Sequence, residues 1–383
     1  MHTMMGLHSV QHTSQQVRLR WADGAEATFA AIWLRDNIPA ARHRADGQKL
    51  FDTTELPAQV HIRDAALSAQ GGLRVSFEPE HLDAEFDASW LARYARPEAG
   101  GGEPRVACGD EPRVGWDASL AALPRADFHD ISSDPRQLAA WLRAVLSHGF
   151  ALLHGVPAQP GRVLDVVALF GYVRETNYGR VFDVITEPAP ANLANAGIAL
   201  GLHTDNPYRD PVPTLQLLHC LAASAHGGDS VLCDGIRVAE ALRAAHPEDF
   251  ALLARHAVRF RYVDEHVDLD CRAPMIETDA AGAVRAVRYN NRSLAPLELD
   301  AQSLPDYYRA YRRFSTLLHD AGATVLFRLA PGDLFIVDNR RVLHGRGAFG
   351  AGRRHLQGCY ADIDSLRSTL RRLERSLGEA QGA

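Results

Sequence analysis

The sequence lacks the features of a membrane or secreted protein. No stretch approaches the roughly 18 consecutive apolar residues that a membrane span requires, although 46% of the 383 residues are apolar, enough for a large core. The opening segment, MHTMMGLHSVQHTSQQ, has no apolar middle region of a signal peptide. The five cysteines are odd in number and form no C-x-x-C pair, which argues against a disulfide framework and a sulfur-rich zinc site. We therefore expect a cytoplasmic protein with no membrane partner.

The sequence also lacks a positive charge balance. Its 47 acidic and 41 basic residues give a formal net charge of −6, and the arginines are scattered along the chain. This pattern excludes the basic groove that a nucleic-acid partner would need. A small acidic or zwitterionic substrate remains compatible with it.

The hydrophobic pattern divides the chain into four predicted segments. Residues 1–16 are expected to be a flexible tail. Alternating runs such as VRLRWADGAEATF and GLRVSFEP predict a small β-rich module over residues 17–97. Residues 98–115, rich in Gly and Pro, are the predicted linker. Residues 116–383 form the predicted main domain.

The main domain begins with a helical pattern and then becomes strand-rich. Runs such as PTLQLLHCL, DSVLCDG, GATVLFRLAPGDLFIVDN and RHLQGCYAD predict strands, and the turn Pro331-Gly332-Asp333 predicts a hairpin between two of them. The last segment has a leucine stripe at helical spacing, which favours packing on its own domain over a subunit contact. The stripe comprises Leu366, Leu370, Leu373 and Leu377.

A candidate metal pair lies in the segment GLHTDNPYRD. His203 and Asp205 are two positions apart, so at the end of a strand both side chains project to one side and can converge on one cation. A third ligand from a distant strand would leave three open positions on an octahedral metal, an arrangement that suits ferrous iron working with oxygen. In a chain with 18 histidines, an H-x-D pair alone is more often a solvated loop.

The segment GDLFIVDNRRVLHGRGAFGAGRRHLQGCYAD supplies the missing partners. An apolar strand ends in a polar turn that carries His344, and Arg354 follows ten residues later. Arginine offers a planar two-pronged donor to a carboxylate. A dicarboxylic co-substrate could therefore bind a metal at one end and Arg354 at the other.

These motifs resemble the γ-butyrobetaine dioxygenase branch of the iron(II)/2-oxoglutarate oxygenases, which includes taurine dioxygenase-like enzymes. The similarity covers residues 17 to about 375 and rests on the combined H-x-D, GGDS, LHGR and RHLQG.YAD pattern. It implies a double-stranded β-helix (jelly roll) with flanking helices, preceded by a small β-rich domain. It also implies Fe(II) as cofactor, with 2-oxoglutarate and O2 as co-substrates.

The resemblance assigns roles to individual residues. It makes His203, Asp205 and His344 the iron ligands, and Arg354 the partner of the distal carboxylate of 2-oxoglutarate. Arg353 is the rival for that role, because the sequence does not fix strand register. Ser230 falls where relatives place a hydroxyl near the co-substrate. The carboxylate of Asp205 favours hydroxylation, because related halogenases leave this site to chloride.

The resemblance also places a substrate pocket. Family substrates carry a trimethylammonium group, which aromatic faces bind well. Tyr178, Phe182 and Tyr360 match aromatic positions of the family's enclosure, although each aromatic could instead belong to the core. Asn192 and Asn290 match amides that bind the substrate carboxylate, although each could instead cap its own turn.

Departures from the family leave the substrate open. Asn195 and Asn206 stand where the animal enzymes have aromatic residues, and Phe182 replaces a larger indole. The leading prediction is hydroxylation of γ-butyrobetaine to L-carnitine. A trimethylammonium phosphonate, trimethyllysine or a sulfonate remain alternatives. In a different class, a zinc-dependent hydrolase or a non-catalytic binding barrel could use the same triad, but no H-E-x-x-H helix is present.

The N-terminal module departs as well. Where many relatives bind structural zinc, this chain has Ile38, Ala40 and His43, and it retains His81. Two histidines do not complete a zinc tetrahedron, so we expect the module to fold without metal. The resemblance implies a homodimer.

Overall fold

A computed structural model describes residues 6–95, 112–185, 199–223, 227–348 and 354–382. The chain divides into two compact units, residues 1–107 and 108–383, and each is described by itself. Within the described ranges, no helix is both long and apolar enough to cross a membrane. Most of the predicted linker, residues 98–115, lies outside these ranges.

The N-terminal unit contains two three-stranded antiparallel sheets. The first has the order β1-β2-β3 and the second β4-β5-β6. In β2, Val17, Leu19 and Trp21 are buried while the residues between them are exposed, so one face of the sheet covers the core. The elements are β1 Leu7–His12, β2 Gln16–Trp21, β3 Glu26–Ala30, α1 Ala31–Asp36, β4 His61–Leu67, β5 Leu73–Glu78, β6 Leu82–Phe86 and α2 Ala88–Tyr94.

The expectation of a flexible tail over residues 1–16 is wrong for its second half. Residues Leu7–His12 form β1, which pairs antiparallel with β2. Its burial comes mainly from Leu7, while Val10 packs partly against the same core. Two apolar side chains in a polar segment are too few to produce a strand pattern in the sequence.

The second unit contains the remaining elements. They are β7 Arg125–Asp127, α3 Phe128–Ser133, α4 Pro135–His148, β8 Phe150–His154, α5 Val163–Ala168, β9 Phe182–Ile185, β10 Leu200–His203, β11 Leu215–Ala222, β12 Ser230–Asp234, α6 Gly235–Ala245, α7 Pro247–Arg255, β13 Val258–Val263, β14 Asp268–Ala273, β15 Ile276–Thr278, β16 Val284–Val287, α8 Leu304–Leu318, β17 Thr324–Phe327, β18 Leu334–Asp338, β19 Val342–Arg346, β20 His355–Ala361 and α9 Ile363–Gly382.

Two largely antiparallel sheets form the double-stranded β-helix that the sequence predicted. One sheet has the order β7-β8-β18-β11-β20-β9, and the other has the order β10-β19-β12-β17. Apolar side chains from both sheets form one buried cluster, as expected of a sandwich. They include Phe150, Leu218 and Phe335 from the larger sheet and Leu232, Val325 and Val342 from the smaller one.

The predicted hairpin at Pro331-Gly332-Asp333 is wrong. The strands on its two sides, β17 and β18, belong to different sheets: β17 pairs with β12, while β18 pairs with β11 and β8. The turn therefore carries the chain from one sheet to the other. The same turn residues can join two strands of one sheet or two strands of different sheets. The sequence therefore could not distinguish a hairpin from a crossing between sheets.

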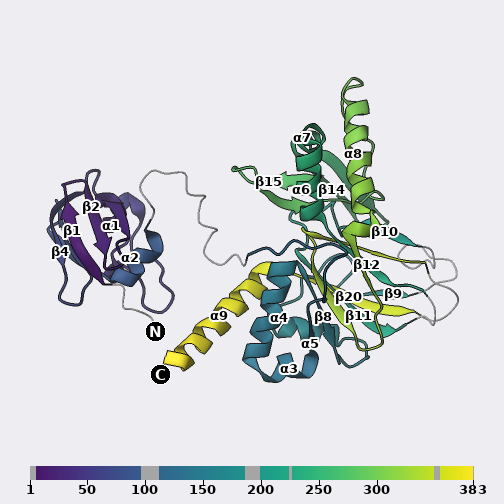
Figure 1. Ribbon diagram of the computed structural model, residues 1–383, viewed down its shortest axis with the longest axis horizontal. Helices are drawn as coiled ribbons and strands as arrows, with labels where there is room; N and C mark the ends of the chain where they lie inside the picture. The colour runs from purple at the N-terminus through teal and green to yellow at the C-terminus, as the bar shows by residue number, and fades with distance from the viewer. Residues whose placement is uncertain (1–5, 96–111, 186–198, 224–226, 349–353, 383) are drawn as a thin grey trace. The chain divides into compact units, whose positions relative to one another are not determined.

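Helices cover the sandwich on both sides (Figure 1). On one side, α3, α4, α5 and α9 lie near β8, β11 and β20. Apolar side chains of these helices and strands form one core, which includes the leucine stripe of α9. The C-terminal helix thus packs on its own domain, as favoured above. On the other side, α6, α7 and α8 pack with residues of β12 and β19 around a separate core.

Candidate active site

Three side chains that could hold a metal ion lie close together in the second unit. His203 ends β10, Asp205 follows two residues later, and His344 lies in the middle of β19. The Asp205 Oδ1 atom is 3.4 Å from His203 Nε2 and 3.9 Å from His344 Nε2. One ligand atom from each residue lies within 4.8 Å of the others, and no second such cluster occurs in the part of the chain that the structure describes. Two imidazole nitrogens and one carboxylate oxygen are the donor set that non-haem ferrous iron takes.

A close backbone approach between β10 and β19 brings the two histidines together. His203 and His344 are register partners, with ring centroids 4.4 Å apart. Gly345 of β19 faces β10, and a Cβ added to it would lie 2.8 Å from the Leu200 carbonyl oxygen. Glycine at this position of the LHGR motif therefore permits the approach.

Asp205 is oriented by hydrogen bonds to one of its two oxygens. Tyr360 donates its hydroxyl to Asp205 Oδ2 at 2.8 Å, and Gln216 donates Nε2 to the same atom at 2.5 Å. Oδ1 is left to face the two histidines. Asn339 fixes the backbone of this residue as well, because Asp205 N donates to Asn339 Oδ1 at 2.7 Å and Asn339 Nδ2 donates to the Asp205 carbonyl at 2.9 Å. Gln216 and Asn339 were missed at the sequence level.

The protonation states suit metal binding. Burial lowers the pKa of His344 to about 3, so this ring is neutral at pH 7. Burial opposes ionisation of Asp205, but the hydrogen bond with His203 and the electrostatic interaction with the two imidazole rings outweigh it and hold the pKa of Asp205 well below its usual value. His203 Nδ1 lies 2.9 Å from the Gly201 carbonyl, which fixes Nδ1 as the protonated nitrogen and leaves the Nε2 lone pair for a cation.

Basic side chains line the same cavity, which has a volume of about 700 Å³. Arg354 lies just before β20, is 6% exposed, and has a pKa lowered by burial. Ser230 is also buried and pairs in register with Arg346, a second cavity-lining arginine that was missed at the sequence level. Arg353, the rival to Arg354, lies outside the described residues.

The predicted aromatic residues are three of five that form one cavity wall. Ring centroids are 5.0 Å apart for Tyr360 and Phe182, and 6.4 Å apart for Phe182 and Tyr178. The wall continues through Tyr262, 6.0 Å from Tyr178, to Tyr208, which stacks on Tyr262 at 5.1 Å. The Tyr178 and Tyr208 hydroxyls are 2.9 Å apart. Tyr262, which lies in β13 of the β13–β14 hairpin, was not predicted from the sequence.

Of the two predicted amide residues, Asn290 lies within the described part of the chain. Asn290 lines the cavity and is 6% exposed. Its Oδ1 accepts the backbone N–H of Arg292 at 3.1 Å, and its Nδ2 donates to the Thr204 carbonyl at 3.2 Å. One donor hydrogen and one acceptor lone pair of its amide therefore serve the backbone. Asn192, like Asn195, lies outside the described residues.

The histidines at the relatives' zinc position have carboxylate neighbours. His43 Nδ1 lies 2.9 Å from Asp46 Oδ1, and His81 Nδ1 lies 3.0 Å from Glu78 Oε1. Folding of the N-terminal module without metal stays a prediction.

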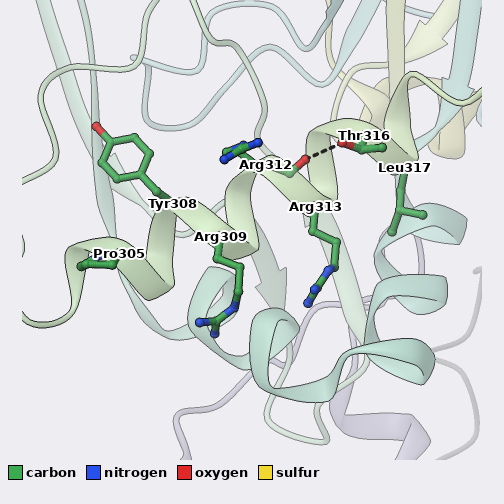
Figure 2. Close-up of a pocket in the computed structure, with 7 residues that line it drawn as sticks. All are labelled: Pro305, Tyr308, Arg309, Arg312, Arg313, Thr316 and Leu317. Carbon is green, nitrogen blue, oxygen red and sulfur yellow. Dashed lines mark hydrogen bonds between the residues drawn. The ribbon is translucent and has the colours of Figure 1, made fainter.

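A separate hollow of about 520 Å³ lies on the outer face of α8 (Figure 2). Two of its arginines, Arg309 and Arg313, form ion pairs with the buried carboxylate of Asp249. These arginines thus join α8 to α7. The hollow is lined by Pro305, Tyr308, Arg309, Arg312, Arg313, Thr316 and Leu317, none of which is a nucleophile or metal ligand suited to chemistry.

Known proteins match the whole chain. Residues 111–360 match the taurine catabolism dioxygenase TauD, TfdA family, and residues 8–92 match the γ-butyrobetaine hydroxylase-like N-terminal family. A γ-butyrobetaine dioxygenase of Pseudomonas sp. (strain AK-1) is 37% identical, over 96% of both chains. The human γ-butyrobetaine dioxygenase is 29% identical over 94% of both chains. A trimethyllysine dioxygenase of Meyerozyma guilliermondii is 27% identical over 95% of both chains.

A solved structure matches the fold of the second unit. The taurine dioxygenase from Burkholderia xenovorans superposes with a TM-score of 0.50 and 17% sequence identity, covering 64% of this chain and 89% of its own. Together with the whole-length sequence relatives, this fold bears out the resemblance drawn from the motifs. The chain belongs to the TauD/TfdA dioxygenase family and is an iron(II)- and 2-oxoglutarate-dependent oxygenase with a γ-butyrobetaine hydroxylase-like N-terminal domain.

Proposed function

We propose that the protein hydroxylates a small trimethylammonium acid, with γ-butyrobetaine as the first candidate and L-carnitine as its product. The observation that carries this proposal is the aromatic wall beside the His203, Asp205 and His344 triad in a single cavity. Quaternary ammonium groups bind to aromatic faces because the cation is attracted by the ring quadrupole and loses little hydration. Dioxygenases named for γ-butyrobetaine and for trimethyllysine match 94–96% of this chain.

The aromatic wall suits a cation for a second reason. Burial raises the pKa of Tyr208 and of Tyr360 well above the usual tyrosine value, so both phenols stay neutral and protonated. The Asp264 carboxylate lies at the same wall, where it accepts the Tyr262 hydroxyl at 2.9 Å. Its negative charge adds to the attraction of a trimethylammonium group.

The same triad residues would hold iron, with Nε2 of each histidine and Oδ1 of Asp205 as donors. Arg354 would bind the distal carboxylate of 2-oxoglutarate through paired charge-assisted hydrogen bonds, with Ser230 beside it. Iron, 2-oxoglutarate and O2 supply the oxidation that inserts a hydroxyl into a C–H bond. The chain's own part is to orient that bond towards the metal and to keep competing groups away.

The proposal extends to the cellular location and the oligomeric state. Cys220, Cys233, Cys271 and Cys359 are free and buried, which fits a reducing compartment, and we propose a cytoplasmic location. We propose a homodimer because the chain resembles the γ-butyrobetaine dioxygenase branch throughout its length.

A turnover screen tests the proposed function. Iron-loaded protein is incubated with 2-oxoglutarate, O2 and one candidate: γ-butyrobetaine, a trimethylammonium phosphonate, trimethyllysine or taurine. Succinate release should rise with a trimethylammonium acid and should be abolished in His203→Ala, but not in His246→Ala, a control at an exposed histidine. Release stimulated by taurine alone, or substrate turnover that needs zinc and no O2, would contradict the proposal.

A further inference from the structure

Two hydrogen-bond donors in the active-site cavity have no partner. Asn206 and Arg292 both line the cavity. Asn206 is 3% exposed, and its Nδ2 atom is buried without a hydrogen-bond acceptor. Within the described ranges, the Arg292 guanidinium has neither an ion-pair nor a hydrogen-bond partner. Because Arg292 is exposed, the donor that indicates a ligand is the buried Nδ2 atom of Asn206, and Arg292 adds a positive charge beside it in the same cavity.

Asn290 ties together the two segments that carry these donors. Its side chain bonds the Thr204 carbonyl on one segment and the Arg292 backbone N–H on the other. A second link joins them, because Thr204 N donates to the Tyr289 carbonyl at 2.7 Å. Asn290 is therefore best understood as a positioning residue for the wall that holds Asn206 and Arg292.

The backbone of Asn206 is held in a strained conformation. Its φ angle is +51°, and His81 is the other non-glycine residue with a positive φ in the described part of the chain. Asparagine tolerates this region better than most residues, and strain of this kind persists where the surroundings fix it, often at ligand sites. The strain keeps the unpartnered amide in the cavity wall.

The charge of Arg292 acts on the metal-binding residues but is not neutralised by them. It is attracted by Asp205 and repels positive charge on His344 and on Arg346. Asp205 has one oxygen bonded to Gln216 and Tyr360, and the other faces the two histidines. Both oxygens of Asp205 are therefore engaged, and within the described residues Arg292 forms no ion pair, so its positive charge can attract an anionic ligand group.

We propose that Asn206 and Arg292 form an acid-group subsite, which binds the oxyanion end of the substrate while the aromatic wall binds its ammonium end. Arg292 makes the subsite select a carboxylate or a phosphonate over an uncharged polar end. This inference rests on the proposed function, which supplies a substrate with two oppositely charged ends. It assigns selectivity to an arginine and a buried amide that the family's motifs do not mark.

Binding without turnover measures the subsite directly. Manganese-loaded protein with 2-oxoglutarate is titrated in a calorimeter with γ-butyrobetaine, its phosphonate analogue and its uncharged primary amide. Arg292→Gln should weaken binding of the carboxylate about tenfold or more, as expected for a lost charge-assisted hydrogen bond. The same substitution should weaken binding of the dianionic phosphonate further. It should change the affinity for the uncharged amide by less than about twofold. Arg292→Lys should restore part of the loss.

A second variant and a control complete the design. Asn206→Gly removes the amide donor but keeps a residue that accepts the positive φ, so it should weaken both acids without unfolding the site. Arg255→Gln changes an exposed arginine outside the cavity and should bind every ligand as the unaltered protein does.

The outcomes separate this inference from the proposed function. Equal weakening of acid and amide binding in Arg292→Gln, or weaker binding of 2-oxoglutarate to that variant in the same calorimeter, would overturn the subsite while leaving the hydroxylase intact. If no trimethylammonium acid binds, but an acid without the ammonium group binds in an Arg292-dependent way, the proposed function fails and the subsite stands.

Discussion

The Tyr360 hydroxyl donates a hydrogen bond to Oδ2 of Asp205 at 2.8 Å, which joins β20 of the larger sheet to the carboxylate that follows β10 of the smaller sheet. The same ring contacts Phe182 in the aromatic wall. Tyr360, predicted from the sequence as a substrate contact, therefore has a second task in holding the carboxylate in its orientation.

Tyr360→Phe separates these two tasks. The ring remains, but Oδ2 of Asp205 keeps only the hydrogen bond from Gln216. We expect metal affinity and kcat to fall about 10-fold to 100-fold, as for other groups that orient metal ligands. Manganese titration and succinate release measure the two effects. Tyr172→Phe, at an exposed tyrosine, is the control. Unchanged metal affinity with a raised substrate KM would assign Tyr360 to the substrate alone.

Arg354→Gln should raise the KM for 2-oxoglutarate. Loss of a two-pronged charge-assisted contact corresponds to a change of about 10-fold to 100-fold. Arg354→Lys should have a KM for 2-oxoglutarate between those of the unaltered protein and Arg354→Gln, because lysine keeps the charge but not the planar donor pair. Initial rates against 2-oxoglutarate concentration check this. A normal KM in Arg354→Gln together with a raised KM in Arg346→Gln would move the assignment to Arg346.

Gly358→Ala tests the aromatic wall. A Cβ atom at this position of β20 would lie 2.6 Å from Cε2 of Phe182 and 2.9 Å from Cδ2 of Leu218, so the phenylalanine ring must move. We expect kcat/KM for the trimethylammonium substrate to fall about tenfold, with 2-oxoglutarate binding unchanged. Gly378→Ala, in open space on α9, is the matched control. Wild-type substrate kinetics would show that Phe182 does not contact the substrate.

His219 predicts a pH effect on stability. The residue is fully buried in β11, and neither ring nitrogen has a partner of good hydrogen-bond geometry. Burial lowers its pKa, although the Val156 backbone and Asp333 nearby oppose this shift. Because the unfolded chain keeps the ordinary pKa of about 6.5, it binds the proton first as pH falls. This histidine therefore costs no stability above pH 6.5 and an increasing amount below it.

Replacing the histidine should remove this loss. His219→Leu should lose less stability than the unaltered protein between about pH 7 and pH 5. Denaturant unfolding at several pH values measures the difference, with the exposed His266→Leu as control. Parallel pH profiles for His219→Leu and the unaltered protein would contradict the prediction.

The sequence predicted the parts of the site that local motifs carry. His203 and Asp205 share one strand end, and His344 and Arg354 belong to one strand, turn and strand segment, so spacing alone relates the members of each pair. A polar residue inside the apolar run LQLLHCL could have pointed to Gln216, which orients Asp205. The family resemblance then joined the two segments and gave the fold class.

The rest depends on contacts between distant segments. Tyr262, Asn290 and Arg292 reach the cavity only because the long segment between β12 and β17 folds back over it. The crossing from one sheet to the other at Pro331 is determined by the pairing of β17 with β12 and of β18 with β11. The turn residues themselves do not determine it. Such pairings are decided by burial across the whole domain.

The segment between β12 and β17 has a consequence for how such enzymes diversify. It has its own buried core with α6, α7 and α8, and it brings Tyr262 and Arg292 to the cavity from outside the strands that bear the triad. Part of the proposed substrate selectivity therefore comes from a stretch of polypeptide separate from the strands that bear the triad. A chimera that exchanges this stretch alone with a relative should acquire the donor's preference among quaternary amines while still consuming 2-oxoglutarate.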